Sequence, residues 1–405
     1  MTGVSQQGER RPGIRQGITV VTAAFLPILA IISMFPAVPA MIQHFSADPA
    51  ASVKVPSMVS APGLTIAIVA LFAGMLVDRF GRRRLLLVAT FFYGIFGALP
   101  FLLDSLNAVY ASRLALGLAE AAILTTLNTL IADYWDEAGR RNWLTVQGLA
   151  GPALSSGVIY FAGSLVQWRW NAIFLLYLVA LPIFLAMWAW LYEPQSNAAA
   201  RAMLGIDERR DQHSEFPWGA ITGIGLLTLF SSAIYYVFII NGGMVWQELG
   251  VRSSADIGRI SALPTLFILA GACVFWTQGR LGVSARGQIF TYLVLLGAGL
   301  ALIGLSHDWK GMVLGMSLQQ TGAGMAVPVL IAWAQSRMPA AHRGRGMGVW
   351  AACFFFGQFS SPLLVSLIRA GTGTMHGAFL VAGLISLAGA LVAWLLLGRS
   401  ATTAK

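Results

Sequence analysis

Apolar runs separated by short polar gaps extend along almost the whole sequence. Each run is close to the length of about 20 residues that a helix needs to cross a bilayer. Twelve of them can be drawn, at residues 16–43, 56–77, 85–103, 107–132, 143–166, 171–192, 217–241, 257–277, 287–305, 309–335, 346–369 and 376–397. The pattern predicts an all-α membrane protein with twelve transmembrane helices, because long runs with few charges are typical of membrane spans.

The longest polar stretch divides the chain near its middle. It runs from Glu193 to Glu215, is rich in charged residues and is bordered by prolines. Such a stretch between two sets of apolar runs is typical of a linker. We therefore predict an N-terminal six-helix half at 1–192, a cytoplasmic linker at 193–216 and a C-terminal six-helix half at 217–405.

Two short motifs recur at a spacing of about 200 residues. Arg79-Phe80-Gly81 returns as Arg280-Leu281-Gly282, and the basic pair Arg140-Arg141 returns as Arg343-Gly344-Arg345. Two correspondences at nearly one spacing predict that the two halves are pseudo-symmetric copies. In transporters built from such repeats, the substrate binds near the membrane midplane, at the interface between the repeats.

The distribution of Lys and Arg predicts the orientation. The gaps that face one side, together with both termini, carry 19 of these residues, whereas the gaps on the other side carry 6. Positive residues accumulate in cytoplasmic loops, so both termini are predicted to be cytoplasmic. The compact loops are typical of a multi-pass protein of the bacterial inner (cytoplasmic) membrane.

Composition excludes several other classes of protein. The chain is 57% hydrophobic and only 10% charged, against about 25% charged in an average soluble domain. The net charge of +10 lies in the gaps between apolar runs and therefore does not indicate nucleic-acid binding. Cys273 and Cys353 both lie inside apolar runs, which argues against a disulfide or a metal site. No phosphate-binding loop or nucleophile triad is visible, so we expect neither an enzyme nor a cofactor.

The second predicted gap carries the most specific motif. Gly74-Met75-Leu76-Val77-Asp78-Arg79-Phe80-Gly81-Arg82-Arg83 matches the pattern Gly-x-Leu-x-Asp-Arg-x-Gly-Arg-Arg at every defined position. In sequence and location it resembles the hallmark motif of the major facilitator superfamily, a family of secondary transporters. The resemblance covers essentially the whole chain and implies the major facilitator fold, with two six-helix halves that alternate access to a central cavity.

The same resemblance implies a conformational latch on the cytoplasmic face. It gives Asp78 the role of capping the start of the eleventh span, where a carboxylate is favoured, and of meeting nearby arginines. Asp133 is the expected partner of the motif's arginines, and the second-half copy keeps only Arg280 and Gly282. The latch set is therefore Gly74, Asp78, Arg79, Gly81, Arg82, Arg83, Asp133 and Arg280. Charges that merely set topology would explain the arginines, but not Asp78 or the glycines.

The fourth predicted span contains two ionisable residues, Arg113 and Glu120, in an otherwise uncharged run. Seven residues bring Glu120 back to the same helix face about 10 Å along the axis, too far for a direct bond. Ionisable residues inside a membrane usually have a functional role. We therefore expect Glu120 to carry the proton, and Arg113 to tune proton binding by Glu120 or to bind substrate. The segment resembles the proton-antiporter motif of the superfamily, and its glutamate resembles spinster-like carriers and organic-anion symporters. Structural pairing with neighbouring helices is the alternative.

Two further spans carry prolines and small residues that predict kinks or close packing. In the fifth span, Gly151 and Pro152 resemble the glycine–proline motif of drug exporters, although Ser155-Ser156 replace the usual glycines. Packing of small residues alone would explain this pattern equally well. In the first span, Pro36 and Pro39 predict a kink, but the acid found in spinster-like carriers is missing there.

Polar residues at membrane depth are the remaining candidates for the substrate cavity. Besides Arg113 and Glu120 they are Tyr235, Tyr236, Asn241, Gln319, Gln320 and Gln358. Some of them must line the aqueous path, because amides facing lipid are penalised. Others are expected to bond between helices.

The sequence as a whole predicts a proton-coupled secondary transporter that exports a small amphipathic drug or metabolite. The alternative is a proton-coupled importer of an organic anion or a siderophore-like solute, with Arg113 binding the negative group. A transceptor or lipid-handling scaffold is a third reading, weakened because no soluble sensor domain is visible. Expected partners are a small-molecule substrate, protons and the lipid bilayer, without nucleic acid, and the chain is expected to be a monomer.

Overall fold

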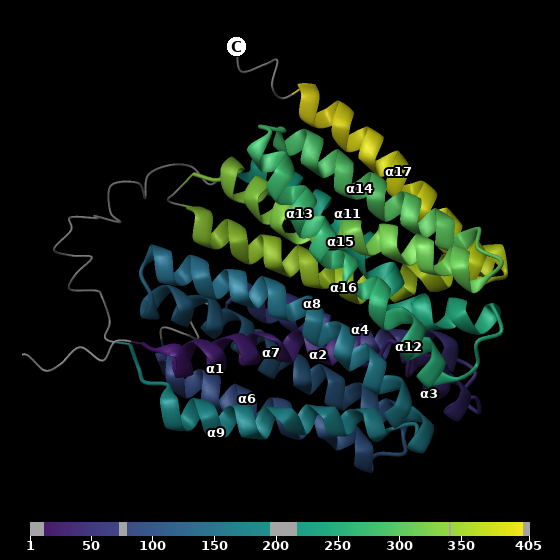
Figure 1. Ribbon diagram of the computed structural model, residues 1–405, viewed down its shortest axis with the longest axis horizontal. Coiled ribbons are helices and arrows are strands. Elements are labelled where there is room, and N and C mark those ends of the chain that lie inside the picture. Colours follow the sequence, from purple (N-terminus) through teal and green to yellow (C-terminus); the bar gives the residue numbers. More distant parts are fainter. Residues whose placement is uncertain (1–11, 73–78, 195–216, 340–341, 400–405) are drawn as a thin grey trace, which may run out of the picture.

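The computed structural model describes residues 12–72, 79–194, 217–339 and 342–399, which form a bundle of helices (Figure 1). No strand occurs among these described residues. Eleven helical segments in this part of the chain are long and apolar enough to cross a membrane. The prediction of a multi-pass, all-α membrane protein is therefore confirmed.

The N-terminal group of helices accounts for the first six predicted spans. It comprises α1 (Ile14–Ala24), α2 (Leu26–Ile32), α3 (Val38–His44), α4 (Ala51–Ala70), α6 (Arg82–Ala98), η1 (Leu99–Leu102), α7 (Leu106–Tyr134), α8 (Glu137–Trp168), η2 (Ala172–Val179) and α9 (Ala180–Trp190). The first span is broken into α1, α2 and α3. Pro36 lies in the turn before α3, and Pro39 occupies its first turn, where the missing N–H of proline costs no helical hydrogen bond.

The C-terminal group of helices accounts for the remaining six spans. It comprises α11 (Trp218–Glu248), α12 (Ser254–Thr265), α13 (Phe267–Arg280), α14 (Ala285–Gly304), α15 (Trp309–Arg337), α16 (Arg343–Thr372) and α17 (Met375–Arg399). Helices α12 and α13 together form one span, interrupted close to Pro264. Most of the predicted linker, residues 195–216, lies outside the described residues, and the pseudo-symmetry of the two halves stays a prediction.

Helix α15 spans 29 residues but is too polar to count among the eleven apolar segments. Its middle carries Gln319 and Gln320, both buried. The helix packs between α13 and α14 inside the C-terminal group. Amides are tolerated at that place because protein, rather than lipid, surrounds them.

The two ends of the bundle differ in charge. Helix α1 begins and α17 ends at the same end of the bundle (Figure 1). The starts of α6 and α8, which carry Arg82 and Arg140, lie at that end too, because Arg83 bonds to the end of α9 and Trp143 packs on Gly17 of α1. Arg337 at the end of α15 lies there beside the last turns of α17. We call it the basic end, and the other the opposite end.

The two groups of helices touch along α4 and α16 and along α8 and α12. The Ser156 hydroxyl in α8 donates a hydrogen bond of 2.8 Å to the carbonyl of Ala262 in α12. Nearer the opposite end, a Cβ added to Gly163 of α8 would lie 2.1 Å from the carbonyl oxygen of Ser254. Toward the basic end, α8 has few contacts with α13, which continues α12. On this side the bundle is closed at the opposite end and loose at the basic end.

Candidate functional site

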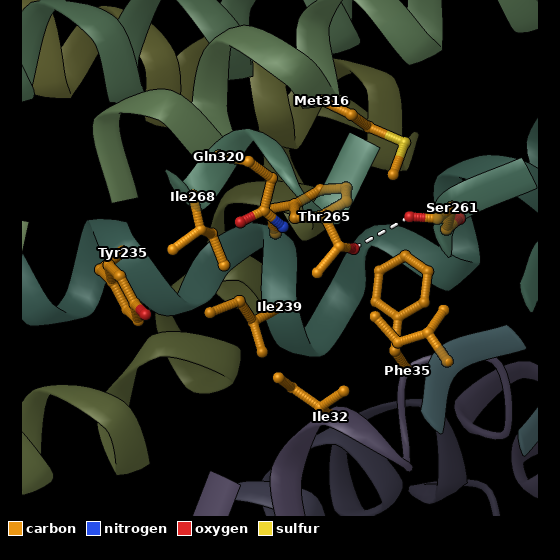
Figure 2. Close-up of a pocket in the computed structure, with 11 residues that line it drawn as sticks. Ile32, Phe35, Tyr235, Ile239, Ser261, Thr265, Ile268, Met316 and Gln320 are labelled. Atoms are coloured by element: carbon orange, nitrogen blue, oxygen red, sulfur yellow. Dashed lines mark hydrogen bonds between the residues drawn. The ribbon is translucent and has the colours of Figure 1, made fainter. Parts of the chain in front are cut away.

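A narrow cavity lies where the two groups of helices meet (Figure 2). Its volume of about 40 Å³ has room for about three water molecules, at roughly 10–15 Å³ each. The lining residues are Ile32, Phe35, Ile159, Tyr235, Phe238, Ile239, Ser261, Thr265, Ile268, Met316 and Gln320. They come from α2 and the turn after it, α8, α11, α12, α13 and α15, so both groups contribute. The lining is mostly apolar and holds no charged side chain.

Gln320 is the polar group of the lining with unused hydrogen-bonding capacity. Its side chain is only 4% exposed, and Oε1 has no hydrogen-bond partner among the described residues. Figure 2 shows the amide reaching toward Ile239 and Thr265. The Thr265 hydroxyl already donates a hydrogen bond of 2.9 Å to the Ser261 carbonyl. The Ser261 hydroxyl accepts a hydrogen bond of 3.1 Å from the indole N–H of Trp246. Gln320 is therefore the better placed of these polar groups to receive a ligand.

Arg113 is fully buried in the N-terminal group and does not line the cavity. Its Nη1 donates a hydrogen bond of 2.7 Å to the hydroxyl of Tyr177, and its Nη2 donates one of 3.0 Å to the carbonyl of Ala30. The Tyr177 hydroxyl in turn donates 2.8 Å to the same carbonyl. The guanidinium also lies 5.0 Å from the centre of the Tyr177 ring. Nη1 and Nη2 thus join α7 to η2 and α2, whereas Nε has no hydrogen-bond partner among the described residues.

Glu120 is 3% exposed, and its Oε1 has no hydrogen-bond partner among the described residues. It forms no ion pair within 4.0 Å in this part of the chain, although it interacts electrostatically with Arg113. It also interacts with Tyr236 of α11, across the interface between the groups. At Gly117, between the two charged residues, α4 packs closely on α7. Arg113 and Glu120 are thus separate, as the seven-residue spacing requires.

Two of the predicted cavity residues, Tyr235 and Gln320, line the cavity. The others do not: Arg113, Glu120, Tyr236, Asn241, Gln319 and Gln358. Gln319 is fully buried, and its backbone lies against Gly299 of α14, so it belongs to the interior of the C-terminal group. Asn241 donates from Nδ2 to the carbonyl of Val237 in its own helix. Consecutive glutamines point about 100° apart on a helix, which is why Gln320 reaches the cavity and Gln319 does not.

Gln358 and Tyr236 belong to the interface between the two groups of helices and do not line the cavity. Gln358 is buried where α16 crosses α4, and its side chain lies 3.2 Å from the place of a Cβ on Gly63. Tyr236 packs edge-on against Tyr235, with ring centroids 4.8 Å apart. Both residues are parts of the interface that any movement between the groups would change.

The arginine motif is tied to the N-terminal group in this conformation. Arg82 Nε lies 2.8 Å from Oδ2 of Asp133, so the structure brings this predicted pair together. Arg83 donates to the carbonyls of Leu191 (2.7 Å) and Trp188 (2.8 Å) near the end of α9. The role of a latch stays a prediction, since these contacts all lie within one group of helices.

Other members of the predicted latch lie apart or outside the described part. Gly74 and Asp78 belong to the segment 73–78, outside the described residues. Arg79 lies 5.7 Å from the ring of its neighbour Phe80, and Arg280 lies 4.9 Å from the ring of Trp276 in its own helix. Gly81 has φ of +78°, a conformation that glycine adopts without strain, directly before α6.

The two residues predicted to pack or kink the fifth span, Gly151 and Pro152, differ in their surroundings. Pro152 is buried inside α8, which continues through it, but Gly151 faces open space. The close helix contact of α8 lies at Gly163 instead. Sequence reasoning selected Gly151 because a proline follows it, whereas the approach of α12 is decided by the crossing of two helices from different groups.

Several residues that shape the site were missed from the sequence. Tyr177 and the carbonyl of Ala30 hold Arg113, and Glu193 holds the start of α6. Thr265 and Ser261 line the cavity. A tyrosine within an apolar run gives a weak signal, and a backbone carbonyl gives none. No group of three or more His, Cys, Asp or Glu side chains that could hold a metal occurs in the described ranges.

Comparisons with known proteins agree with the fold. The sequence profile of the Major Facilitator Superfamily matches residues 20–306 and 224–405. The 3-(3-hydroxy-phenyl)propionate transporter of Escherichia coli (strain K12) is 25% identical over 311 residues, covering 76% of this chain and 75% of that protein. The "Probable galactarate/D-glucarate transporter GudP" of Bacillus subtilis (strain 168) is 22% identical over 389 residues, covering 86% and 84%.

The chain is similar in fold to a solved structure of a bacterial homologue of the human lysosomal transporter Spinster. That structure is in an inward-facing and occupied conformation. The TM-score is 0.74 at 11% sequence identity, over 95% of this chain and 96% of that one. At this identity the similarity concerns the arrangement of the helices, and the chemistry of the site has to be argued from this chain's own residues.

Proposed function

Because the chain belongs to the Major Facilitator Superfamily of membrane transporters, we propose that it takes up a small organic acid anion together with protons. The observation that carries this proposal is the buried Glu120 carboxyl, with an unpartnered oxygen and no ion pair among the described residues. Leaving a carboxylate unpaired inside a protein is costly. Such a group persists where it has a task, and binding and releasing a proton is the task that suits it.

The substrate class is supported by two relatives and by the cavity. The relatives are named for 3-(3-hydroxy-phenyl)propionate and for galactarate or D-glucarate, which share carboxylate groups and little else. The largely apolar lining suits a carbon skeleton, although a cavity of about 40 Å³ has to widen when the groups of helices move before it holds such an acid. Nε2 of Gln320 can then donate to a carboxylate oxygen, and its unpartnered Oε1 can accept from a hydroxyl group. We therefore expect an amphipathic organic acid to be preferred over a polyhydroxylated diacid.

The proposed topology places the basic end in the cytoplasm, as the distribution of Lys and Arg favours. The looseness of the bundle between α8 and α13 then corresponds to an inward-facing state. Glu120 takes up a proton when the site faces outward and releases it inward, while Arg113 sets the electrostatic surroundings from its place beside Tyr177. Rocking of the two groups of helices supplies the alternation.

Uptake by purified protein in liposomes tests the proposal. Labelled 3-(3-hydroxyphenyl)propionate and D-glucarate are offered outside vesicles whose interior is alkaline. Wild type is expected to accumulate the aromatic acid in proportion to the pH gradient. Glu120→Gln should abolish gradient-driven accumulation but keep exchange of substrate at equal pH, which shows that the variant is folded. Glu137→Gln, which removes an exposed carboxylate at the basic end, is the matched control.

Undiminished accumulation by Glu120→Gln, with an unchanged pH profile, would remove Glu120 from the mechanism. Export of an amphipathic compound in exchange for protons is the second candidate, and the apolar lining of the cavity favours it. If vesicles accumulate neither acid but move a lipophilic compound against a gradient when protons flow the other way, export replaces uptake as the function.

A further inference from the structure

A groove of about 570 Å³ lies between α11, α15 and α17 at the basic end of the C-terminal group. We call it the α11–α17 groove and define it by Gly219, Gly223, Leu226, Trp333, Arg337 and Val392, which all line it. Its volume falls within the range of about 300–1,000 Å³ typical of ligand pockets. It lies apart from the cavity of Figure 2, with which it shares no lining residue.

The groove opens on the outside of the helix bundle, where lipid lies. Leu226 on one wall is 64% exposed, and Val392 on the other is 54% exposed. A Cβ added to Gly219 or to Gly223 would meet nothing within 4 Å, so these glycines leave the space between the helices empty. The interior of the groove is almost entirely apolar, which suits a hydrocarbon chain.

Among the described residues that line the groove, one is charged, Arg337 at its mouth. Arg337 ends α15, is exposed, and has no ion-pair or hydrogen-bond partner among the described residues. Helix α11 begins at the same place, and its N-cap Pro217 supplies no side-chain cap. Gly219 and Ala220 lie in its first turn, and their N–H groups have no acceptor in the described part of the chain. A helix N-terminus beside an unpaired arginine favours a phosphate group.

We propose that the α11–α17 groove binds one anionic phospholipid from the membrane leaflet at the basic end. An acyl chain lies along the glycines, and the phosphate meets Arg337 and the start of α11. A lipid with net negative charge is favoured over a zwitterionic one, because the described residues that line the groove include Arg337 and no acidic side chain that would attract a choline or amine. A second copy of the chain fits less well, since two-fold pairing through this face would bring two Arg337 side chains together.

Native mass spectrometry of the full chain in detergent tests the proposal. Wild type is titrated with dioleoyl-phosphatidylglycerol and with dioleoyl-phosphatidylcholine. Arg337→Gln should weaken phosphatidylglycerol binding roughly fivefold, the effect of one arginine at an anionic surface, and leave phosphatidylcholine binding unchanged. Gly223→Leu, which fills the groove without a clash at Cβ, should weaken binding of both lipids. Soluble glycerol phosphate should not compete, because it lacks the acyl chain.

Matched controls separate the groove from general effects. Arg15→Gln removes an exposed arginine from α1, and Gly371→Leu adds a side chain at another open glycine near the end of α16. Both should bind lipid like wild type. If one of the two groove variants, Arg337→Gln or Gly223→Leu, unfolds in detergent at a lower temperature than wild type, the lipid binding of the other variant tests the proposal.

Four results would overturn the proposal. The first is that wild type binds the two lipids equally, and the second is that Arg15→Gln and Arg337→Gln lose the same amount of phosphatidylglycerol binding. The third is that glycerol phosphate competes fully with phosphatidylglycerol. The fourth is that the protein forms a lipid-free dimer, which the Gly223→Leu substitution dissociates. The third would indicate a free-phosphate site, and the last an interface between copies. None of these outcomes depends on the substrate or on proton coupling.

Discussion

Arg113 and Glu120 lie on one helix face but have different surroundings. The donors of Arg113 reach the Tyr177 hydroxyl and the Ala30 carbonyl, so its charge is stabilised inside the N-terminal group. Glu120 has no such partner among the described residues, and its charge acts on Tyr236 of the other group as well as on Tyr93 and Tyr177 of its own. The arginine is therefore a fixed part of one group, whereas the surroundings of the glutamate change when the groups move.

Tyr177→Phe should lower the stability of the folded protein by about 1–3 kcal/mol, because it leaves Arg113 Nη1 without its buried acceptor. Denaturant unfolding of the purified protein, followed by tryptophan fluorescence, measures the change. Tyr110→Phe, on the same helix as Arg113 and without a hydrogen-bond partner in the described part, should have little effect. Equal stability of Tyr177→Phe and wild type would mean that water or another group satisfies the guanidinium.

Two helices are capped at their first residues by a glutamate side chain from a distant segment of the chain. The carboxylate of Glu193 accepts from the backbone N–H groups of Arg82 (2.7 Å) and Arg83 (2.9 Å) at the start of α6. The carboxylate of Glu248 likewise accepts from the N–H groups of Met375 (2.7 Å) and His376 (3.0 Å) at the start of α17. A negative group is favoured at a helix N-terminus, because the first N–H groups have no partner within the helix.

Removal of one cap should loosen one helix end. Glu193→Ala is expected to cost about 0.5–2 kcal/mol, the usual effect of losing a cap, and to expose the peptide bonds after Arg82 and Arg83 to trypsin. Limited proteolysis in detergent, with the fragments identified by mass, provides the measurement. Asp104→Ala, which removes an exposed acid outside the helices, is the control. Unchanged cleavage in Glu193→Ala would show that contacts of α6 with its neighbours hold its start in place.

The whole molecule is asymmetric about the interface between the two groups of helices. On the α8 side, Gly163 lies against Ser254 and the Gln167 amide donates 2.8 Å to the Ser253 hydroxyl, both near the opposite end. Toward the basic end, the same helix has few contacts with α13, which continues α12. Alternating access requires a second state in which the contacts at the opposite end are broken and contacts at the basic end are formed.

Gly163→Leu should favour the state that is open at the opposite end. A side chain there would collide with the Ser254 carbonyl, 2.1 Å from the added Cβ. Such overpacking costs about 1–3 kcal/mol, which shifts a two-state equilibrium by about 5- to 150-fold. The readout is labelling of a Thr265→Cys reporter by an impermeant maleimide from each side of sealed vesicles, with Cys273 and Cys353 replaced by serine.

Gly157→Leu provides the control for the same helix, because its added Cβ would meet nothing within 4 Å. It should leave labelling from both sides close to that of the reporter alone. If Gly163→Leu also leaves both rates unchanged, the contact at Gly163 does not govern the conformational balance, and closure has to be sought along α4 and α16.

The sequence by itself determined the class of the protein and the course of the chain through the membrane. Apolar runs of sufficient length must become helices in lipid, since every backbone polar group needs an internal partner there. This requirement acts locally, so each of the twelve predicted spans overlaps one or more helices among the described residues, including α15 despite its glutamines. The motif around Arg82 predicted the family for the same reason: its residues are neighbours in the chain.

Tertiary structure alone decided which polar residues meet. In a membrane protein the lipid and the protein interior are both apolar, so hydrophobic periodicity does not tell which face of a helix is buried. Gln319 and Gln320 are equal in sequence terms, but only Gln320 lines the cavity. Likewise Tyr177 reaches Arg113 and Glu193 reaches Arg82 from 64 and 111 residues away along the chain. Such contacts depend on how helices cross, which no local pattern records.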